Sequence, residues 1–118
     1  MTLLTLRGVT RDFHLRGGVL GRRRALRALD GIDLVLHPGE TLALVGESGC
    51  GKSMTCFAIS GLLPKRGRIS RGAAVLDGTD LTQQSAKAMR MIRRKDIAVV
   101  FQDATNGLNP VKTVGWQI

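Results

Sequence analysis

Two kinds of apolar pattern alternate along the first hundred residues of the chain. Residues 3–9 and 32–36 place apolar side chains at every second position, which is typical of half-buried strands, and we expect the two to pair antiparallel. Residues 41–45 and 97–101 are instead almost continuously apolar, the pattern of strands that are covered on both faces in a parallel sheet. The pattern therefore predicts an α/β domain with both kinds of sheet.

Helices and turns are predicted between these strands. Apolar residues at spacings of three and four indicate a helix from Lys52 to Leu62, ended by the Gly61 to Pro64 segment. Residues 73–76 indicate an edge strand that turns at Asp77-Gly78, and Ala86 to Arg94 indicates a basic helix. Loops are expected at residues 16–24, 65–72 and 106–110, and residues 113–118 begin a further element.

Composition narrows the class of protein. The 118 residues are 43% hydrophobic and 23% charged, which favours a globular domain with a core over a disordered tail. No apolar stretch approaches the ~18 residues of a membrane-spanning helix, and the first residues do not form a secretory signal. We therefore expect a cytosolic protein in which Cys50 and Cys56 stay reduced, without a disulfide framework or zinc site.

The segment Gly46-Glu47-Ser48-Gly49-Cys50-Gly51-Lys52-Ser53 matches G-x-x-x-x-G-K-[ST] without a mismatch. It joins a predicted buried strand to a predicted helix, the context in which this pattern forms a phosphate-binding loop. Glycine at 46, 49 and 51 lets the backbone bend tightly and bring several amides to phosphate oxygens. Lys52 can bridge the outer phosphates as a point charge, and the Ser53 hydroxyl suits Mg²⁺, which prefers oxygen ligands. Nucleotide binding is thus the predicted chemistry.

A family resemblance extends this interpretation. The 46–53 loop, followed by Ile97-Ala98-Val99-Val100-Phe101-Gln102-Asp103, Leu108-Asn109-Pro110 and Thr113-Val114-Gly115, resembles the ATP-binding subunits of ABC transporters, most of all the dipeptide/oligopeptide/nickel importers. The resemblance implies a P-loop NTPase fold, with residues 1–118 as the amino-terminal part of the nucleotide-binding domain. That part would hold an antiparallel β subdomain and an incomplete parallel core sheet, with the family's Q-loop at residues 101–110.

The resemblance also implies roles for single residues. Lys52 and Gln102 would be catalytic, Ser53 and Gln102 would meet Mg²⁺, and Phe13 would stack on the adenine of ATP. An aromatic residue after an alternating strand is equally consistent with a core anchor, so both interpretations of Phe13 remain open. The remaining predicted cofactor-binding residues are those of the loop and the position after it: Gly46, Glu47, Ser48, Gly49, Cys50, Gly51, Lys52, Ser53 and Met54.

Three departures from the family pattern bear on this expectation. Met54 stands where the family usually has a threonine whose hydroxyl approaches the α-phosphate, and Thr55 is turned about 100° further round a helix. Residues 104–107 replace a familiar proline-containing stretch. The Leu-Ser-Gly-Gly-Gln signature, the strand ending in Asp-Glu and the switch histidine do not occur in the sequence, and neither His14 nor His37 matches that histidine. We therefore expect ATP binding with little or no turnover.

The implied function is ATP binding and hydrolysis coupled to import of peptides or similar small solutes. The implied partners are transmembrane permease subunits, a second ATP-binding subunit in a homo- or heterodimer and, indirectly, a solute-binding protein. The implied location is the cytoplasmic face of the membrane, as a peripheral subunit. An incomplete parallel sheet would also leave an unpaired edge, so we expect the isolated chain to be poorly soluble.

Other functions remain as alternatives. The chain could bind nucleotide without turnover, or be a different P-loop enzyme such as a small-molecule kinase. The net charge of +9 permits anionic partners, but aromatic residues are only 3% of the chain, and no nucleic acid is expected. We expect the Arg22 to Arg24 run to be a solvated loop, whereas the 86–94 helix could approach anionic lipid headgroups. Cys50, beside a helix start, could make the loop sensitive to oxidation.

Overall fold

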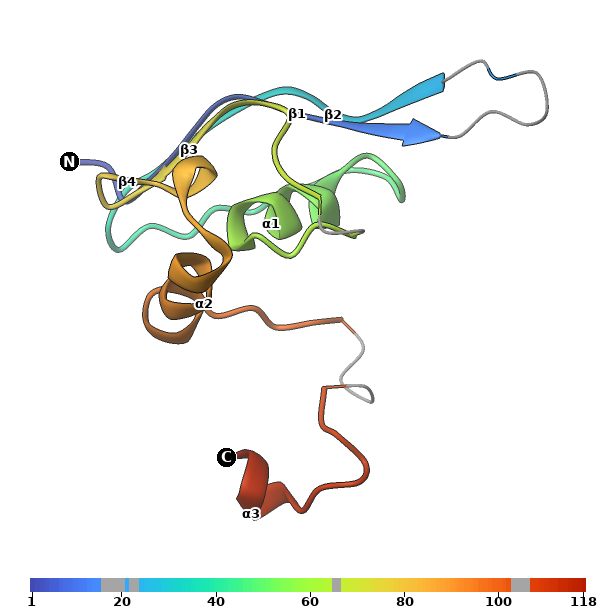
Figure 1. The fold of residues 1–118 in the computed structure, drawn as a ribbon. Coiled ribbons are helices and arrows are strands. Elements are labelled where there is room, and N and C mark those ends of the chain that lie inside the picture. The colour runs from blue at the N-terminus through green and yellow to red at the C-terminus, as the bar shows by residue number, and fades with distance from the viewer. Residues whose placement is uncertain (16–20, 22–23, 65–66, 103–106) are drawn as a thin grey trace.

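A computed structural model describes residues 1–15, 21, 24–64, 67–102 and 107–118 of the chain. Much of the loop expected at residues 16–24, including Arg22 and Arg23, lies outside these residues, as do residues 65–66 and 103–106. The described part contains one sheet with helices on one side of it, as Figure 1 shows.

The sheet has four strands in the order β2-β1-β3-β4, and every neighbouring pair is antiparallel. Its strands are β1 (Leu4–Leu15), β2 (Arg24–Leu36), β3 (Arg71–Leu76) and β4 (Thr79–Asp80). The helices are α1 (Lys52–Ser60), the short 3₁₀ helix η2 (Leu81–Gln83), α2 (Ala86–Lys95) and α3 (Val114–Gln117). In the described part of the chain, no helix is both long enough and apolar enough to cross a bilayer. The predicted antiparallel subdomain is confirmed.

Strands β1 and β2 are longer than the alternating pattern predicts, and they form a ribbon that runs from the Leu4–Leu36 pair to the Leu15–Arg24 pair. The register shifts along the ribbon, first between Leu6 and Val9. Gly8 lies there with φ 55°, and its N–H donates to Asp33 Oδ1 at 2.7 Å. Such bulges break the two-residue alternation, which is why the full length of the strands is not visible in the sequence.

The predicted turn at Asp77-Gly78 is confirmed. Both residues have positive φ, 44° and 78°, and they join Leu76 of β3 to its partner Thr79 of β4. Two consecutive positive φ values are characteristic of the two-residue hairpin turns that match the twist of the strands they connect.

Helix α1 and helix α2 both form where the pattern predicts helices. Helix α1 ends at Ser60, where Gly61 adopts φ 67° and closes the helix with left-handed geometry. Ser85 caps the amino end of helix α2 because its hydroxyl accepts from the Ala88 N–H at 3.1 Å, and α2 has basic side chains in its last turn. Arg93 donates to the Ser60 carbonyl oxygen at 3.0 Å and thereby joins α2 to the end of α1.

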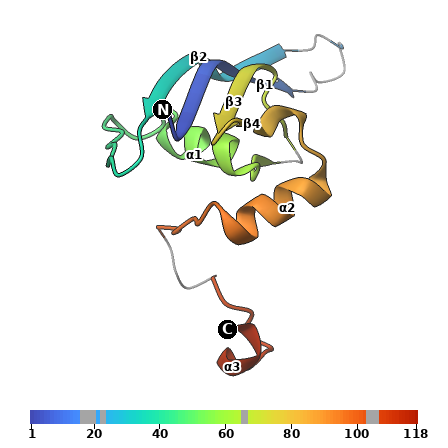
Figure 2. The ribbon, with the colours of Figure 1, turned by 90° about the vertical axis from the view of Figure 1, so that its left-hand side faces the viewer.

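The core lies between the sheet and the helices beneath it, as Figure 2 shows. Strands β1, β2 and β3 supply one apolar side of this core, and α1, the residues after it, η2 and α2 supply the other. The buried core residues are Leu4, Leu6, Val9, Leu29, Ala58, Leu63, Ala74, Leu81 and Met89. Because α1 contacts β2, and Gly51 at its start lies against Leu29, the amino end of α1 is fixed against the ribbon.

The two parallel strands predicted at residues 41–45 and 97–101 do not form, which corrects that part of the fold expectation. Both segments lack strand hydrogen bonds, and Val45 and Val100 are 92% and 96% exposed. A continuous run of apolar residues indicates only that a segment could form a strand buried on both faces. A parallel strand also needs neighbouring strands and helices on both faces, and within the described ranges no strand lies beside either segment.

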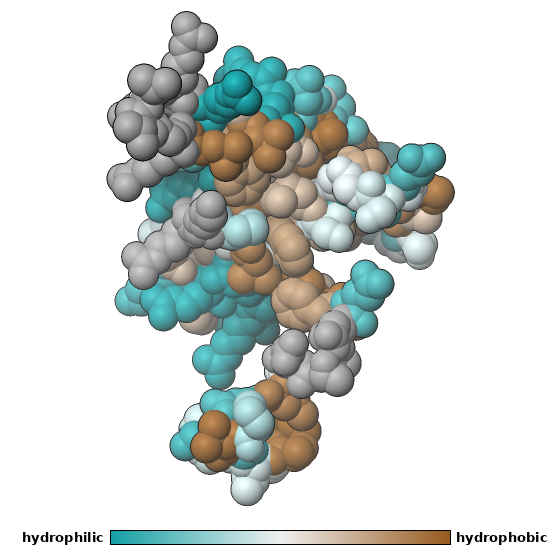
Figure 3. All heavy atoms as spheres, turned by 90° about the vertical axis from the view of Figure 1, so that its right-hand side faces the viewer, coloured by the Kyte–Doolittle hydropathy of each residue, from teal (hydrophilic) through white to brown (hydrophobic). Residues whose placement is uncertain are grey.

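The carboxyl-terminal residues 107–118 form a small unit below α2 in Figures 1 and 2. The Gln117 side chain holds it together: its oxygen accepts from the Asn109 N–H at 2.6 Å, and its nitrogen donates to the carbonyl oxygens of Asn109 and Lys112 at 3.1 and 3.0 Å. Apolar side chains gather on its surface, seen at the foot of Figure 3. The largely exposed ones are Leu108, Val111, Val114, Trp116 and Ile118.

Candidate functional site

The loop at residues 46–51 encloses the side chain of Lys52. The Lys52 Nζ donates to the carbonyl oxygens of Gly46 and Glu47 at 2.7 and 2.8 Å, and it lies 3.4 Å from the Cys50 Sγ. The ammonium is thus folded across the loop rather than extended into solvent. The loop closes on itself through a hydrogen bond of 3.3 Å from the Cys50 N–H to the Glu47 carbonyl oxygen.

Two of the loop glycines, Gly49 and Gly51, adopt the left-handed φ that favours glycine, 82° and 99°. A Cβ built on Gly46 would lie 2.5 Å from the Cys50 Sγ, so the cysteine side chain would have to move. Gly51 has φ 99°, and a Cβ there would lie 3.3 Å from the Leu29 Cδ2. Gly51 therefore supplies both the left-handed conformation that starts α1 and the close approach of α1 to β2.

The amino end of α1 faces the loop without a neutralising group of its own. Gly51 caps the helix with no side-chain hydrogen bond, and the first turn contains no acidic residue. The first amides and the positive end of the helix dipole are therefore left for an anion. Thr55 Oγ1 donates to the Gly51 carbonyl oxygen at 2.8 Å and is buried, so, as expected, this hydroxyl is turned away from the site and does not replace the one that Met54 lacks.

A cavity of about 640 Å³ opens between this loop, the ribbon and the segment before residue 103. Such a volume lies within the usual range for small-molecule sites, about 300–1,000 Å³. Its lining residues come from three separate parts of the chain: Leu26, Arg27, Ala28, Ser48, Gly49, Gly51, Lys52, Ser53, Met54 and Gln102.

Most of the predicted site residues meet in this cavity. Gln102 lines it together with the loop although no strand precedes Gln102. Gly46, Glu47 and Cys50 are not among the lining residues; the first two accept hydrogen bonds from the Lys52 ammonium, and the third contacts it through sulfur. The predicted loop and Gln102 thus lie at one cavity, but Gln102 was placed at the end of a strand that does not form.

Phe13 lies beside the cavity rather than in its lining. It is half-buried on β1, directly opposite Leu26 on β2, and directly paired residues of an antiparallel ribbon share one face. The Arg11 guanidinium carbon lies 4.5 Å from the centre of the Phe13 ring. Phe13 is not one of the buried core residues or of the side chains packed against them, so the adenine-stacking role stays a prediction, and its ring already has a cationic neighbour.

The β2 residues 26–28 are part of the lining that sequence reasoning missed. The pattern predicted a strand only from residue 32, and the preceding residues repeat as Ala-Leu-Arg-Ala-Leu, which has a spacing of three rather than two. Residues 26–28 are recognised as a strand only from their pairing with β1, and this pairing depends on bulges in the ribbon.

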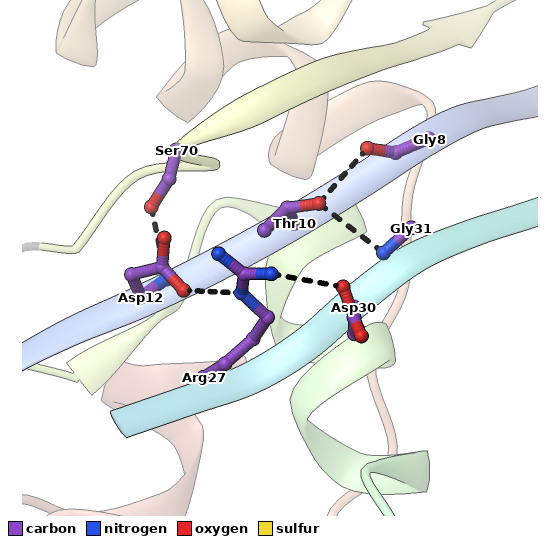
Figure 4. A network of polar contacts seen from close by, with 7 residues as sticks. All are labelled: Gly8, Thr10, Asp12, Arg27, Asp30, Gly31 and Ser70. Atoms are coloured by element: carbon purple, nitrogen blue, oxygen red, sulfur yellow. Dashed lines mark hydrogen bonds and ion pairs between the residues drawn. The ribbon is translucent and has the colours of Figure 1, made fainter. Parts of the chain in front are cut away.

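Arg27 is held by two carboxylates on the ribbon, as Figure 4 shows. Its Nε donates to Asp12 Oδ1 at 2.9 Å and its Nη1 to Asp30 Oδ1 at 3.3 Å. The hydrogen bond from Arg27 lowers the pKa of Asp12 below the usual value of 3.8, and the bond to Asp12 raises the pKa of Arg27. The Asp12 N–H donates to Ser70 Oγ at 3.0 Å, which fixes this pair to the start of β3.

A second part of Figure 4 shows how the ribbon is fixed next to the site. The buried Thr10 Oγ1 donates to the Gly8 carbonyl oxygen and accepts from the Gly31 N–H, both at 3.2 Å. These bonds satisfy backbone groups at a bulge, where regular pairing is interrupted. Thr10 on β1 therefore helps to hold β2, which forms one wall of the cavity.

The oxygen donors of the site suit Mg²⁺ only together with phosphate. Ser53 and Gln102, whose side chains contain neutral oxygens, both line the cavity. Within the residues that the structure describes, no group of three or more His, Cys, Asp and Glu side chains could hold a metal ion. A hard cation here would thus take most of its ligands from a bound phosphate and water, as Mg²⁺ does in nucleotide sites. Cys50 and Cys56 are both free thiols in the structure.

Comparison with known proteins agrees with these features. The family model described as ABC transporter matches residues 29–117. A protein of Brucella ovis named as a peptide import ATP-binding protein is 42% identical over 122 aligned residues, covering 98% of this chain and 34% of its own length. The oligopeptide transport ATP-binding protein of Streptococcus pneumoniae is 43% identical, and the dipeptide transport ATP-binding protein of Bacillus subtilis is 40% identical, each over 98% of this chain.

The alignments cover nearly all of this chain but only part of each relative. They cover 31% of the Streptococcus protein and 33% of the Bacillus protein. The chain therefore spans about a third of the length of the curated relatives that it matches.

Proposed function

The chain belongs to the ABC transporter family, and on that premise we propose that residues 1–118 are the nucleotide-binding, amino-terminal part of an ATP-binding subunit of a peptide importer. The names of the relatives, which are ATP-binding proteins of peptide, oligopeptide and dipeptide transport, support the choice of peptides as the transported solute. The complete subunit would couple ATP binding and hydrolysis to transport.

The observation that carries the proposal is the position of Lys52. Its ammonium lies among carbonyl oxygens of a glycine loop, at the uncapped amino end of α1, in the cavity that Gln102 also lines. A triphosphate in this cavity would meet backbone amides, a helix end and a mobile cation at once. Residues Gly46 to Met54 would form the phosphate cradle, and the ribbon residues Leu26 and Phe13 would lie towards the base.

Mg²⁺ fits the same site, and when bound it would neutralise part of the phosphate charge. Ser53 would hold it through the hydroxyl, and Gln102 would approach it, or the water bound to it, through the side-chain oxygen. Lys52 would bind and orient the outer phosphates, and it needs no deprotonation to do so because its role is that of a charge.

The assembly that we propose follows the family. Transmembrane permease subunits and a second ATP-binding subunit would be direct partners, and a solute-binding protein would act through the permease. The subunit would lie at the cytoplasmic face of the membrane. Residues 107–118, which follow Gln102 in the sequence, support this arrangement because they present exposed apolar side chains that a partner subunit could cover.

A second candidate function is nucleotide binding without turnover by this chain. The lining residues in the described part of the cavity include no Asp, Glu or His, the side chains that most often act as general base towards a water molecule. Incubating the chain with radiolabelled ATP separates the two functions. Phosphate release above a no-protein control supports turnover, whereas retained and intact ATP supports binding alone.

The proposal is tested by titrating the wild-type chain and Lys52→Ala with Mg·ATP. A lost charge-assisted contact to phosphate weakens affinity by about 10- to 100-fold. Lys87→Ala is the matched control, because it removes an exposed lysine from α2 outside the cavity. Equal affinities of the wild type and Lys52→Ala, with both folded by circular dichroism, would refute the proposed site.

A further inference from the structure

An aromatic contact connects the two halves of the nucleotide cavity. The rings of Phe57 on α1 and Phe101 have their centres 6.3 Å apart and are tilted by 37°. This distance lies within the ~4.5–7 Å range of aromatic pairs. Phe101 is the residue immediately before Gln102, and Phe57 is on the helix that starts with Lys52 and Ser53.

The position of Phe57 on α1 is the first step of the argument. Residues four apart lie on the same face of a helix, so Phe57 follows Ser53 by one turn along one face. Ser53 lines the cavity and Phe57 is half-buried against the core. The helix backbone therefore fixes the attachment points of the Phe57 ring and the Ser53 hydroxyl relative to each other.

The second step is how residues 97–102 are held. The segment has no strand hydrogen bonds, and its amino end is fixed by the Ile97 N–H, which donates to the Ile92 carbonyl oxygen at 3.2 Å, and by Ile97 packing against the core. Val100 is almost fully exposed. Near Gln102, the aromatic contact between Phe101 and Phe57 joins the segment to α1.

We propose that Phe57 and Phe101 form a positioning pair that sets the place of Gln102 relative to Ser53 and Lys52. This inference rests on the proposed function, because it assigns to the ring contact the spacing between the two oxygen donors for Mg·ATP. Neither ring touches the nucleotide. The pair acts by holding the backbone of residue 102 at the cavity, where a strand would otherwise determine its position.

The readout is the Mg²⁺ dependence of ATP affinity in the 118-residue chain. A ribose-labelled fluorescent ATP is titrated by anisotropy, once with Mg²⁺ and once with EDTA. The ratio is the dissociation constant in EDTA divided by the dissociation constant with Mg²⁺, so a larger ratio means that Mg²⁺ strengthens binding more. The phosphate loop contributes to both titrations, whereas Gln102 contributes to the titration with Mg²⁺. We expect Phe101→Ala and Phe57→Ala to lower the ratio about two- to tenfold, the range for loss of an aromatic pair. Affinity in EDTA should change less than about twofold.

Three variants make the result specific. Phe57→Tyr keeps a ring and should restore the wild-type ratio, and Ile59→Ala, on α1 and also packed against the core, should leave the ratio unchanged. In a Gln102→Ala background, Phe101→Ala should lower the ratio no further, because Gln102 is then absent. Phe101 is half exposed and outside regular structure, so its removal opens no core cavity and the test does not depend on Phe57→Ala folding.

The failures of the two proposals are distinguishable. A folded wild-type chain that binds no ATP in either buffer refutes the proposed function. A wild-type chain that binds ATP but whose ratio is unity, or is the same in Phe101→Ala, overturns the positioning pair alone. An effect of Phe101→Ala that is equally large with and without Gln102 also overturns it, since the ring would then act through another group.

Discussion

The β1–β2 ribbon and residues 41–45 follow one another along the chain, yet only the ribbon forms strands. Both are rich in apolar residues. The ribbon buries Leu6 to 1% exposure, whereas Leu44 remains 42% exposed. The ribbon strands are close neighbours in sequence and pair antiparallel, and the third strand of the sheet adds to β1.

The difference shows what a parallel strand requires beyond its own composition. An antiparallel pair can be joined by a short connection, whereas a parallel pair needs a long crossover and cover on both faces. Residues 41–45 and 97–101 are separated by α1, β3, β4 and α2, and within the described residues they do not pair with each other. The antiparallel sheet is therefore the stable part of the fold, and the site lies along its border with the uncovered segments.

The largest expected effect comes from the same change, leucine to alanine, made once in each of the two regions. Leu6→Ala should lower the free energy of unfolding by about 2–5 kcal/mol, because it leaves a cavity in the core beneath β1. Leu44→Ala should change it by less than about 1 kcal/mol, because that side chain is already partly in water. Urea denaturation followed by circular dichroism gives both values. Similar losses for the two variants would mean that residues 41–45 belong to the cooperative core.

Gly51 lies where the two regions meet, and Gly51→Ala should cost about 1–3 kcal/mol. The left-handed φ of 99° disfavours a Cβ, and that Cβ would also press on Leu29 of β2. Gly115→Ala is the control, since its Cβ meets nothing within 4 Å and its φ is not positive. The same urea titration measures both. Equal stability of the two variants would contradict the contact between the start of α1 and β2.

Thr10 tests the ribbon side of the comparison with a smaller expected effect. Thr10→Val keeps the shape of the side chain but removes the oxygen that pairs with Gly8 and Gly31 backbone groups. The loss should be about 1–2 kcal/mol, the cost of leaving partly buried polar groups unpaired. Thr82→Val serves as a comparison, because Thr82 bonds a side chain, Asp80, which the Thr82 N–H still contacts. A neutral Thr10→Val would show that water replaces the hydroxyl at the bulge.

The smallest expected effect is a dependence of stability on pH. The pKa of Asp12 is lowered in the folded chain, mainly by its hydrogen bond from Arg27 and also by the charges of Arg27, Arg71 and His14. The Asp12 contribution is therefore fully present above the unfolded value near 3.8, and it is lost as the pH falls through the lower folded value. Thermal melts of the wild type and Asp12→Asn between pH 7 and pH 2.5 should converge at the acid end. Parallel curves would contradict the assignment.

The sequence predicted those parts of the fold whose signals are local. Helix α1 ends beside the predicted Gly61, and the Asp77-Gly78 turn has the positive φ values that its residue types favour. The strand predicted at residues 97–101 is wrong. An apolar run shows that a segment could form a buried strand, but it does not show whether other elements are present to bury it.

The same distinction applies to the site. The loop from Gly46 to Ser53 could be predicted because its chemistry is contiguous in sequence, and Gln102 could be predicted from a family resemblance. The β2 wall at Arg27 could not, because its approach to the loop depends on the register of the ribbon and on the absence of a Cβ at Gly51. Contacts between distant segments are set by packing, which a local pattern does not describe.

The hydrogen bonds of Lys52 with Gly46 and Glu47 have a consequence for the kinetics of the loop. The ammonium already has two backbone acceptors, so a phosphate that binds would have to replace the carbonyl oxygens of Gly46 and Glu47 as its hydrogen-bond partners. Departure of the nucleotide would be assisted by the same two carbonyls, which recapture the lysine as the phosphate leaves. Because the two carbonyl oxygens hold the Lys52 ammonium when no phosphate is bound, the loop can keep the same conformation before binding and after release.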